Sequence, residues 1–168
     1  EAIYYMTGES RAKIESSPHL EAFREKGYEV LILTEPVDEV WAGAVTEFQE
    51  KKLQSIGKGA VDLGTDEEKK AAEETRKEKE KDYASLLELM KTKLEEHVKD
   101  VRLSNRLTTS AACIVSDSED LSPQLEQMMK AMGQEFPDTK RILELNPSHE
   151  ILEKLQSIYT ADKEDSIL

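Results

Sequence analysis

The sequence predicts an α/β (α+β) chain in which two small mixed subdomains are joined by a long charged helix. Short apolar runs closed by glycine or proline, at residues 3–6 and 28–33, alternate with stretches of helical periodicity. A capping box formed by Thr65 and Glu68 opens a long helical pattern, charged at first and apolar toward His97. Strand patterns return after that helix, so each side of it contains both kinds of element.

The first subdomain is expected over residues 1–62. Residues 3–6 and 28–33 are predicted as buried strands, and the helical stretch between them is capped by Gly27. Strand, helix and strand in this order indicate a βαβ unit with a parallel pair. A further helix is predicted over residues 36–48 and a short strand over 52–56.

The second subdomain is expected over residues 63–168, with the connecting helix at 65–98 and an α/β part at 99–168. Strands are predicted at residues 101–103, 112–115 and 141–145. Two helices are expected to start at Ser122-Pro123 and Asn146-Pro147, because each pair places an N-cap side chain before a proline. The second half of the connecting helix should dock through its apolar residues, Tyr83, Leu86, Leu87, Met90, Leu94 and Val98.

Composition narrows the classes of partner and compartment. The net charge of −13 over 168 residues repels phosphate backbones and anionic lipid, so neither nucleic acid nor membrane is expected as a partner. No stretch approaches the ~20 apolar residues of a membrane span. The single cysteine, Cys113, excludes an intrachain disulfide and favours a cytoplasmic location. Because the chain opens on a strand pattern without methionine, we expect a piece of a longer protein.

One motif suggests catalysis. Gly8-Glu9-Ser10-Arg11-Ala12 follows a predicted strand and opens a predicted helix, as the nucleophile elbow of a hydrolase would. Alanine replaces the second glycine, however, and nothing identifies which of the three histidines would be the base. We therefore interpret Ser10 as a helix-start residue, with a small serine hydrolase using Ser10 as the alternative function.

Other candidate sites have simpler interpretations. Gly57-Lys58-Gly59 lacks the spacing of a phosphate loop and is predicted as a turn. The histidines lack metalloprotease spacing, and the carboxylates are too numerous for one acid and base pair to be identified. No catalytic residue, cofactor or metal is therefore expected in this segment.

The most informative element is an amphipathic stretch from Leu121 to Gly133. Its apolar residues recur at helical spacing on one face, and three of them are methionines. Such a stripe is compatible with a buried core helix. Methionine is also flexible and polarisable, which suits a surface that binds many shapes. The stripe consists of Leu121, Leu125, Met128, Met129 and Met132.

Several segments, in order and over nearly the whole chain, resemble the Hsp90 family of molecular chaperones, particularly its bacterial members. They lie at residues 2–10, 17–18 with 26–31, 46–48 with 51–56, 98–104 with 106–108, and 143–149. Gln49-Glu50 stands where the family usually has Asp-Gly, which makes a tight turn less expected before Lys51.

The resemblance implies a place within a longer protein. Residues 1–62 match the last subdomain of the middle domain, and residues 63–168 match the C-terminal domain. The family's ATP pocket and catalytic arginine lie upstream, so ATP and magnesium are expected only in the full-length protein, and this segment is not expected to be an enzyme. The family's homodimer is made by helices at the extreme C-terminus, about where this chain stops.

The resemblance also implies a binding role. The amphipathic helix that carries Leu121, Leu125, Met128, Met129 and Met132 corresponds to a family helix that contacts client proteins. Glu39, Val40 and Trp41 correspond to a second client-facing region. We therefore expect a segment that binds partly unfolded clients and scaffolds dimerisation. A purely structural dimerisation module, with the methionine stripe buried, is the other alternative.

Overall fold

The computed structural model describes residues 2–61, 63–134 and 139–163 of the chain. Its helices and two small sheets confirm the α+β class. The chain packs as two compact units, which we call the first unit (residues 1–60 and 116–139) and the second unit (61–115 and 140–168). The domain boundary at residues 62 and 63 that the family resemblance implies stays a prediction.

The sheet of the first unit has the strand order β2-β1-β4-β3. Its central strand β1 (Ala2–Thr7) is parallel both to β2 (Val30–Leu33) and to β4 (Lys51–Ser55), which confirms the predicted βαβ unit. The edge strand β3 (Glu47–Phe48) is antiparallel to β4. The buried apolar residues of this unit are Ile14, Leu20, Ala22, Phe23, Ala42 and Ile56.

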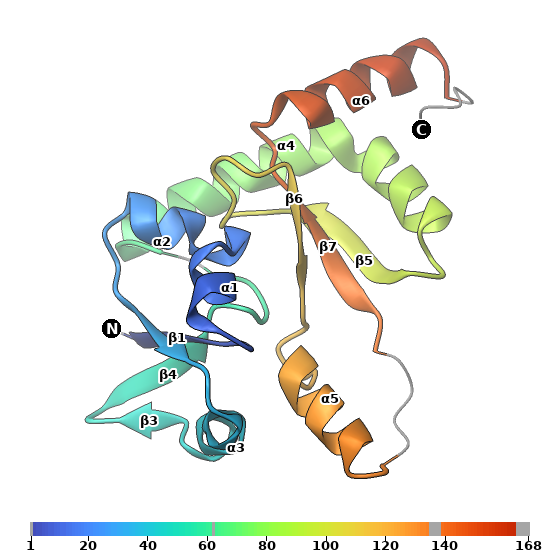
Figure 1. Ribbon diagram of the computed structural model, residues 1–168. Coiled ribbons are helices and arrows are strands. Elements are labelled where there is room, and N and C mark those ends of the chain that lie inside the picture. Colours follow the sequence, from blue (N-terminus) through green and yellow to red (C-terminus); the bar gives the residue numbers. More distant parts are fainter. Residues whose placement is uncertain (1, 62, 135–138, 164–168) are drawn as a thin grey trace. The chain divides into compact units, whose positions relative to one another are not determined.

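Two short helices connect β1 to β2. These are α1 (Arg11–Glu15) and α2 (Glu21–Glu25), with a 3-10 turn at Pro18–Leu20 before α2. Both helices lie on the same side of the sheet (Figure 1), and Phe23 packs edge-on against the Tyr4 ring at a centroid distance of 4.9 Å. Gly27 ends α2 with a φ of 70°, the left-handed conformation that the predicted cap requires.

The next helix is shorter than the sequence predicted. Helix α3 spans Pro36–Ala44 rather than residues 36–48, and the chain then forms β3 and turns back into β4. The pairing of Phe48 with Lys51 requires a two-residue turn, so Gln49 and Glu50 adopt φ values of 49° and 62°. The tight turn thus forms without the glycine that would favour it. Pairing to β4 outweighs the helical pattern of residues 45–48.

The sheet of the second unit has the strand order β5-β7-β6. Strand β5 (Val98–Leu103) is parallel to β7 (Arg141–Leu145), and β6 (Ala112–Val115) is antiparallel to β7. All three predicted strands are present, although β5 starts three positions earlier than predicted because the helix before it ends early.

Helix α4 (Asp66–Lys93) and helix α6 (Glu150–Ala161) cover one face of this sheet (Figure 1). The capping box of Thr65 and Glu68 at the start of α4 is confirmed, with Thr65 Oγ1 accepting from the Glu68 amide. The buried cluster between these helices and the sheet consists of Leu86, Val98, Val101, Leu103, Leu145 and Leu152. The predicted docking residues Tyr83, Leu87, Met90 and Leu94 pack against it.

Helix α6 begins three residues later than predicted. Its N-cap is His149, whose Nδ1 accepts from the Ile151 amide, rather than Asn146. Asn146 is buried in the preceding turn instead, where its Oδ1 accepts from the Ser148 amide at 2.9 Å and its Nδ2 donates to the Ser110 carbonyl at 3.0 Å. The local bond to Ser148 and the tertiary bond to Ser110 hold Asn146 in the turn before the helix, so the prediction of an Asn146 cap is wrong.

The opposite face of the second sheet contains a buried ion cluster. Glu144 is 3% exposed, and its Oε2 accepts from Arg106 Nε and from the Ser104 hydroxyl, each at 2.8 Å. Its Oε1 accepts from Arg102 Nη2, also at 2.8 Å. Burial alone would raise the pKa of Glu144, but the charge of Arg106 and the bonds from Arg102 and Ser104 outweigh it, so the pKa lies below its ordinary value.

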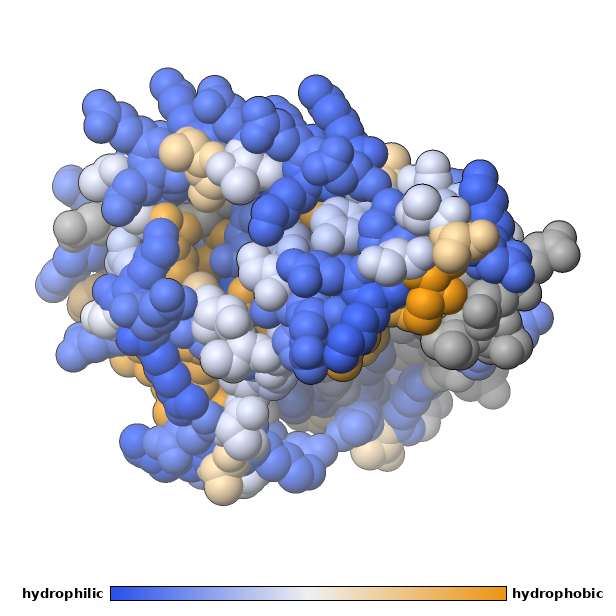
Figure 2. Space-filling view, turned by 90° about the horizontal axis from the view of Figure 1, so that it is seen from above, coloured by the Kyte–Doolittle hydropathy of each residue, from blue (hydrophilic) through white to orange (hydrophobic). Residues whose placement is uncertain are grey.

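One face of the molecule is strongly polar (Figure 2). Figure 2 shows one face of the molecule covered largely by hydrophilic residues, as the 35% charged composition leads one to expect. Among the described residues, no helix is long and apolar enough to cross a membrane.

The Glu144 cluster predicts a pH dependence of stability. A carboxyl whose folded pKa lies below the ordinary 4.5 stabilises the fold above that pH, and this contribution is lost as pH falls through the folded pKa. We expect the free energy of unfolding, measured by urea titration, to fall as pH drops below 4.5. Glu144→Gln should lower stability by about 3 kcal/mol at pH 7 and flatten the acid decline. The control is Glu153→Gln, at an exposed position on α6. Parallel pH profiles for wild type and Glu144→Gln would contradict the assignment.

Candidate functional site

Helix α5 (Pro123–Ala131) belongs to the first unit, where it packs beside α3. Its predicted N-cap is confirmed, because Ser122 Oγ accepts from the Leu125 amide at 3.1 Å. The same hydroxyl donates to Glu39 Oε2 at 2.6 Å. Ser122 is buried, so one side chain both starts α5 and attaches it to α3.

Two further links hold the segment before α5 in place. Lys58 Nζ donates to the Asp120 carbonyl at 2.7 Å. The backbone of Ser116 bonds to both glycines that flank Lys58: the Gly59 amide donates to the Ser116 carbonyl at 2.9 Å, and the Ser116 amide donates to the Gly57 carbonyl at 3.2 Å. The predicted turn at residues 57–59 is therefore also the attachment point of a distant segment.

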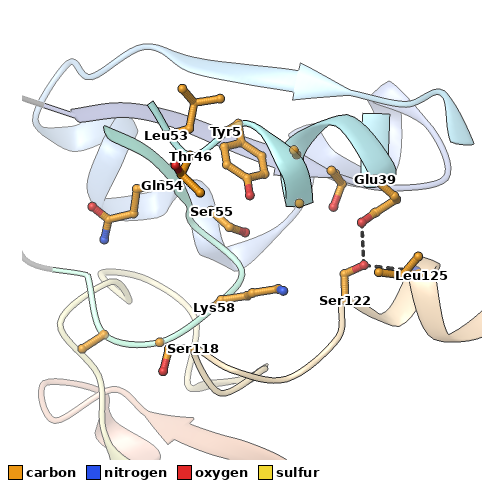
Figure 3. Close-up of a pocket in the computed structure, with 15 residues that line it drawn as sticks. Tyr5, Glu39, Thr46, Leu53, Gln54, Ser55, Lys58, Ser118, Ser122 and Leu125 are labelled. Atoms are coloured by element: carbon orange, nitrogen blue, oxygen red, sulfur yellow. Dashed lines mark hydrogen bonds between the residues drawn. The ribbon is translucent and has the colours of Figure 1, made fainter. Parts of the chain in front are cut away.

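These links border an open cavity of about 420 Å³. Its walls come from β1, α3, β4, the turn at Lys58 and the start of α5, and the side chains of Tyr5, Ser55 and Lys58 point into it (Figure 3). Burial raises the pKa of the Tyr5 hydroxyl, and the negative charge of Glu39 raises it further. The remaining polar side chains of the wall are Thr7, Glu39, Thr46, Gln54, Ser118 and Ser122.

A second hollow, of about 430 Å³, lies at the start of α3. Leu33, Pro36 and Met128 supply apolar walls, and Gln124 and Gln127 of α5 supply polar ones. Glu39 lines both hollows. The side chain that attaches α5 to α3 is thus shared by both of these hollows.

The predicted site residues all fall in the first unit. Four residues of the methionine stripe, Leu121, Leu125, Met128 and Met129, are half-buried, and Met132 is 64% exposed. No residue of α5 is fully buried. On α3, Val40 is 56% exposed and Trp41 is 42% exposed, whereas Glu39 is half-buried against Ser122. The two predicted client-facing regions therefore lie on neighbouring helices.

The structure gives Ser10 the role that the sequence analysis favoured. Its hydroxyl is the N-cap of α1 and accepts from the Lys13 amide at 3.3 Å. Within the described ranges, no histidine is hydrogen-bonded to this hydroxyl. A metal site of three or more histidine, cysteine or carboxylate ligands is likewise absent from the part of the chain that the structure describes.

Sequence reasoning missed three contributors to the site. Lys58 was predicted only as part of a turn, Tyr5 only as part of a strand, and Ser122 only as a cap. The lysine between two glycines was a usable signal, because glycines allow close approach of another backbone and the lysine can then reach into the gap. No local pattern indicates that Tyr5 and Ser122 face the same cavity.

Comparison with known proteins decides the family. The family model described as Hsp90 protein matches residues 1–168. The chain belongs to the Hsp90 family. Its relatives include proteins named Chaperone protein HtpG from Rhodococcus jostii, 59% identical over 168 residues, and from Nocardia farcinica, 57% identical over 166 residues. A third, from Mycobacterium leprae, is 51% identical over 166 residues.

The relatives are longer than this Hsp90 chain. The alignments cover 100%, 99% and 99% of the chain but only 26%, 26% and 25% of the relatives from Rhodococcus, Nocardia and Mycobacterium leprae. The chain therefore spans about a quarter of the length of the relatives it matches. The resemblance to bacterial Hsp90 inferred from the sequence is confirmed.

The double role of Ser122 can be measured. Ser122→Ala removes both the cap of α5 and the donor to Glu39, so we expect it to destabilise the fold by about 2 kcal/mol in urea unfolding, at the upper end for a cap. Ser10→Ala is the matched control, because Ser10 caps α1 and its hydroxyl makes no second hydrogen bond to the described residues. It should cost about 1 kcal/mol or less. Equal losses in the two variants would show that the bond to Glu39 contributes nothing.

Proposed function

We propose that this chain is the segment of an ATP-dependent chaperone that binds partly unfolded client proteins, on a surface formed by α3 and α5. The observation that carries the proposal is the position of the methionine stripe, which contains no fully buried residue and lies along a helix packed against α3, the helix of the exposed Val40 and Trp41. Membership of the Hsp90 family and the chaperone names of the relatives support it.

The chemistry of this surface suits unfolded chains. Methionine has a flexible, polarisable side chain, so Met128, Met129 and Met132 can repack against apolar groups of different shape. Each Å² of apolar area removed from water contributes ~25 cal/mol, which makes several modest contacts sufficient for reversible binding. The net charge of −13 keeps a protein with exposed apolar residues in solution.

The contribution of this segment would be non-covalent. We propose that it has no catalytic activity and binds no cofactor or metal itself, with ATP and magnesium bound by another part of the full-length protein. Unfolded or partly folded proteins are then its partners, together with a second copy in a full-length homodimer that this segment helps to scaffold. Nucleic acid and membranes are not partners in this proposal, and the cytoplasm is the compartment.

The first test separates binding from stability. Met128→Ser with Met129→Ser should weaken suppression of the aggregation of a model client by the 168-residue chain. The urea midpoint should change little, because neither side chain is fully buried, whereas truncating one buried methionine costs ~2 to 5 kcal/mol. Ile151→Ser, at an exposed apolar position on α6, is the control and should leave suppression intact. A large fall in the urea midpoint of the double variant would show that the methionine stripe is part of the buried core and not a binding surface.

The second test concerns nucleotide. Calorimetric titration of the chain with ATP and magnesium should show no saturable heat, because the nucleotide site of the family is expected upstream. Saturable binding in the micromolar range would contradict the proposal that ATP and magnesium bind only in another part of the full-length protein.

A further inference from the structure

We infer that the cavity beneath α3 binds the main chain of an extended client segment, with Lys58 donating to a client carbonyl and Glu39 accepting from a client amide. This inference rests on the proposed client-binding function and specifies which part of the client is recognised. It starts from two groups of opposite charge, Lys58 and Glu39, that line one cavity and are bonded to other partners among the described residues rather than to each other.

The Lys58 ammonium group has N–H donors that are not used within the described residues. An ammonium group carries three N–H donors, and the one bond formed by Lys58 among the described residues goes to the Asp120 carbonyl. The side chain is half-buried and points into the cavity (Figure 3), where Ser55 and Tyr5 supply neutral hydroxyls. A neutral oxygen entering the cavity would therefore meet a charged donor in a partly desolvated site, where such a bond is stronger than in water.

One carboxylate oxygen of Glu39 has no hydrogen-bond donor among the described residues. Its Oε2 accepts from Ser122, but its Oε1 is buried without a hydrogen-bond partner in the described part of the chain. A buried carboxylate oxygen without a donor is costly, and a ligand that supplies the donor removes that cost. The terminal torsion of glutamate is broad, so a small rotation can present the oxygen to the cavity while the bond to Ser122 is kept.

The peptide group matches both requirements. It carries one acceptor and one donor on every residue except proline, so a single extended segment can satisfy Lys58 and Glu39 together. Main-chain recognition is also independent of client sequence. It would complement the methionine stripe, where Met128 adapts to varied apolar side chains, and would give a promiscuous surface a fixed polar anchor.

The probe is a neutral, extended synthetic peptide of alternating apolar and glycine residues, titrated by fluorescence anisotropy. Lys58→Met keeps an unbranched side chain that is one atom shorter and removes the donor, so it should weaken binding about tenfold, the effect of one hydrogen bond to a charged group. Lys52→Met, at an exposed position on β4 outside the cavity, is the control and should bind like wild type. Urea midpoints of both variants check that the fold is retained. Equal affinities in the two variants would overturn the inference.

A second peptide tests the acceptor. N-methylation removes amide donors and leaves the carbonyls, so the methylated peptide should bind wild type more weakly than its parent. This penalty should shrink several-fold in Glu39→Gln, whose amide oxygen can still accept from Ser122 but whose NH2 group cannot accept from a client amide. An unchanged penalty would show that client amides do not reach Glu39.

If neither peptide binds wild type, the client-binding function itself fails. If the parent binds and only Met128→Ser with Met129→Ser weakens it, that function stands and the main-chain inference falls.

Discussion

The arrangement of the candidate site depends on one hydrogen bond, from the Ser122 hydroxyl to Glu39 Oε2. The two residues are 83 positions apart, and at 2.6 Å their bond brings the start of α5 to the middle of α3. Because Ser122 also accepts from the Leu125 amide, the direction in which α5 leaves this point is fixed by the same atom. The bonds of Lys58 to Asp120 and of Ser116 to the neighbouring glycines fix the segment that leads there. The methionine stripe and the exposed face of α3 are thus presented by a small number of polar contacts.

The two units differ in how completely their buried charged groups are hydrogen-bonded. In the second unit, both oxygens of Glu144 have charged or hydroxyl donors, and Arg106, which is 1% exposed, is matched to it. Such a fully paired cluster contributes to one defined structure. In the first unit, Glu39 keeps one oxygen without a donor, and Lys58 bonds only to a neutral carbonyl among the described residues. A buried charged group whose atoms are all hydrogen-bonded stabilises the fold. A charged group beside a cavity that has an unused donor or acceptor can still form a hydrogen bond to a ligand.

Elements determined by local contacts could be predicted from the sequence, and elements determined by distant ones could not. The cap at Thr65, the left-handed Gly27 and the Ser122 start of α5 depend on neighbours within a few residues. Residues 45–48 carry a helical pattern, but pairing of Phe48 with Lys51 makes them part of a hairpin. Asn146 has the local signature of a cap, but its side-chain amide donates to the distant carbonyl of Ser110 and the helix starts later.

The same distinction applies to the site. Periodicity alone was enough to find the stripe on α5, and the family resemblance pointed to α3. The cavity could not be predicted, because Tyr5, Lys58 and Ser118 meet only through the folded sheet and its connections. Loops and turns contribute four of its nine polar side chains, Thr46, Lys58, Ser118 and Ser122, and their sequences carry little periodic information.

Site-specific photo-crosslinking to a permanently unfolded client tests the central claim most directly. A photoreactive side chain would replace Trp41 or Met132 in the first unit, or exposed Lys154 on α6 as the reference position. The proposed function predicts strong crosslinks from positions 41 and 132, competed away by excess unlabelled client, and weak ones from position 154. Crosslinks of equal strength from all three positions, or none from 41 and 132, would contradict it.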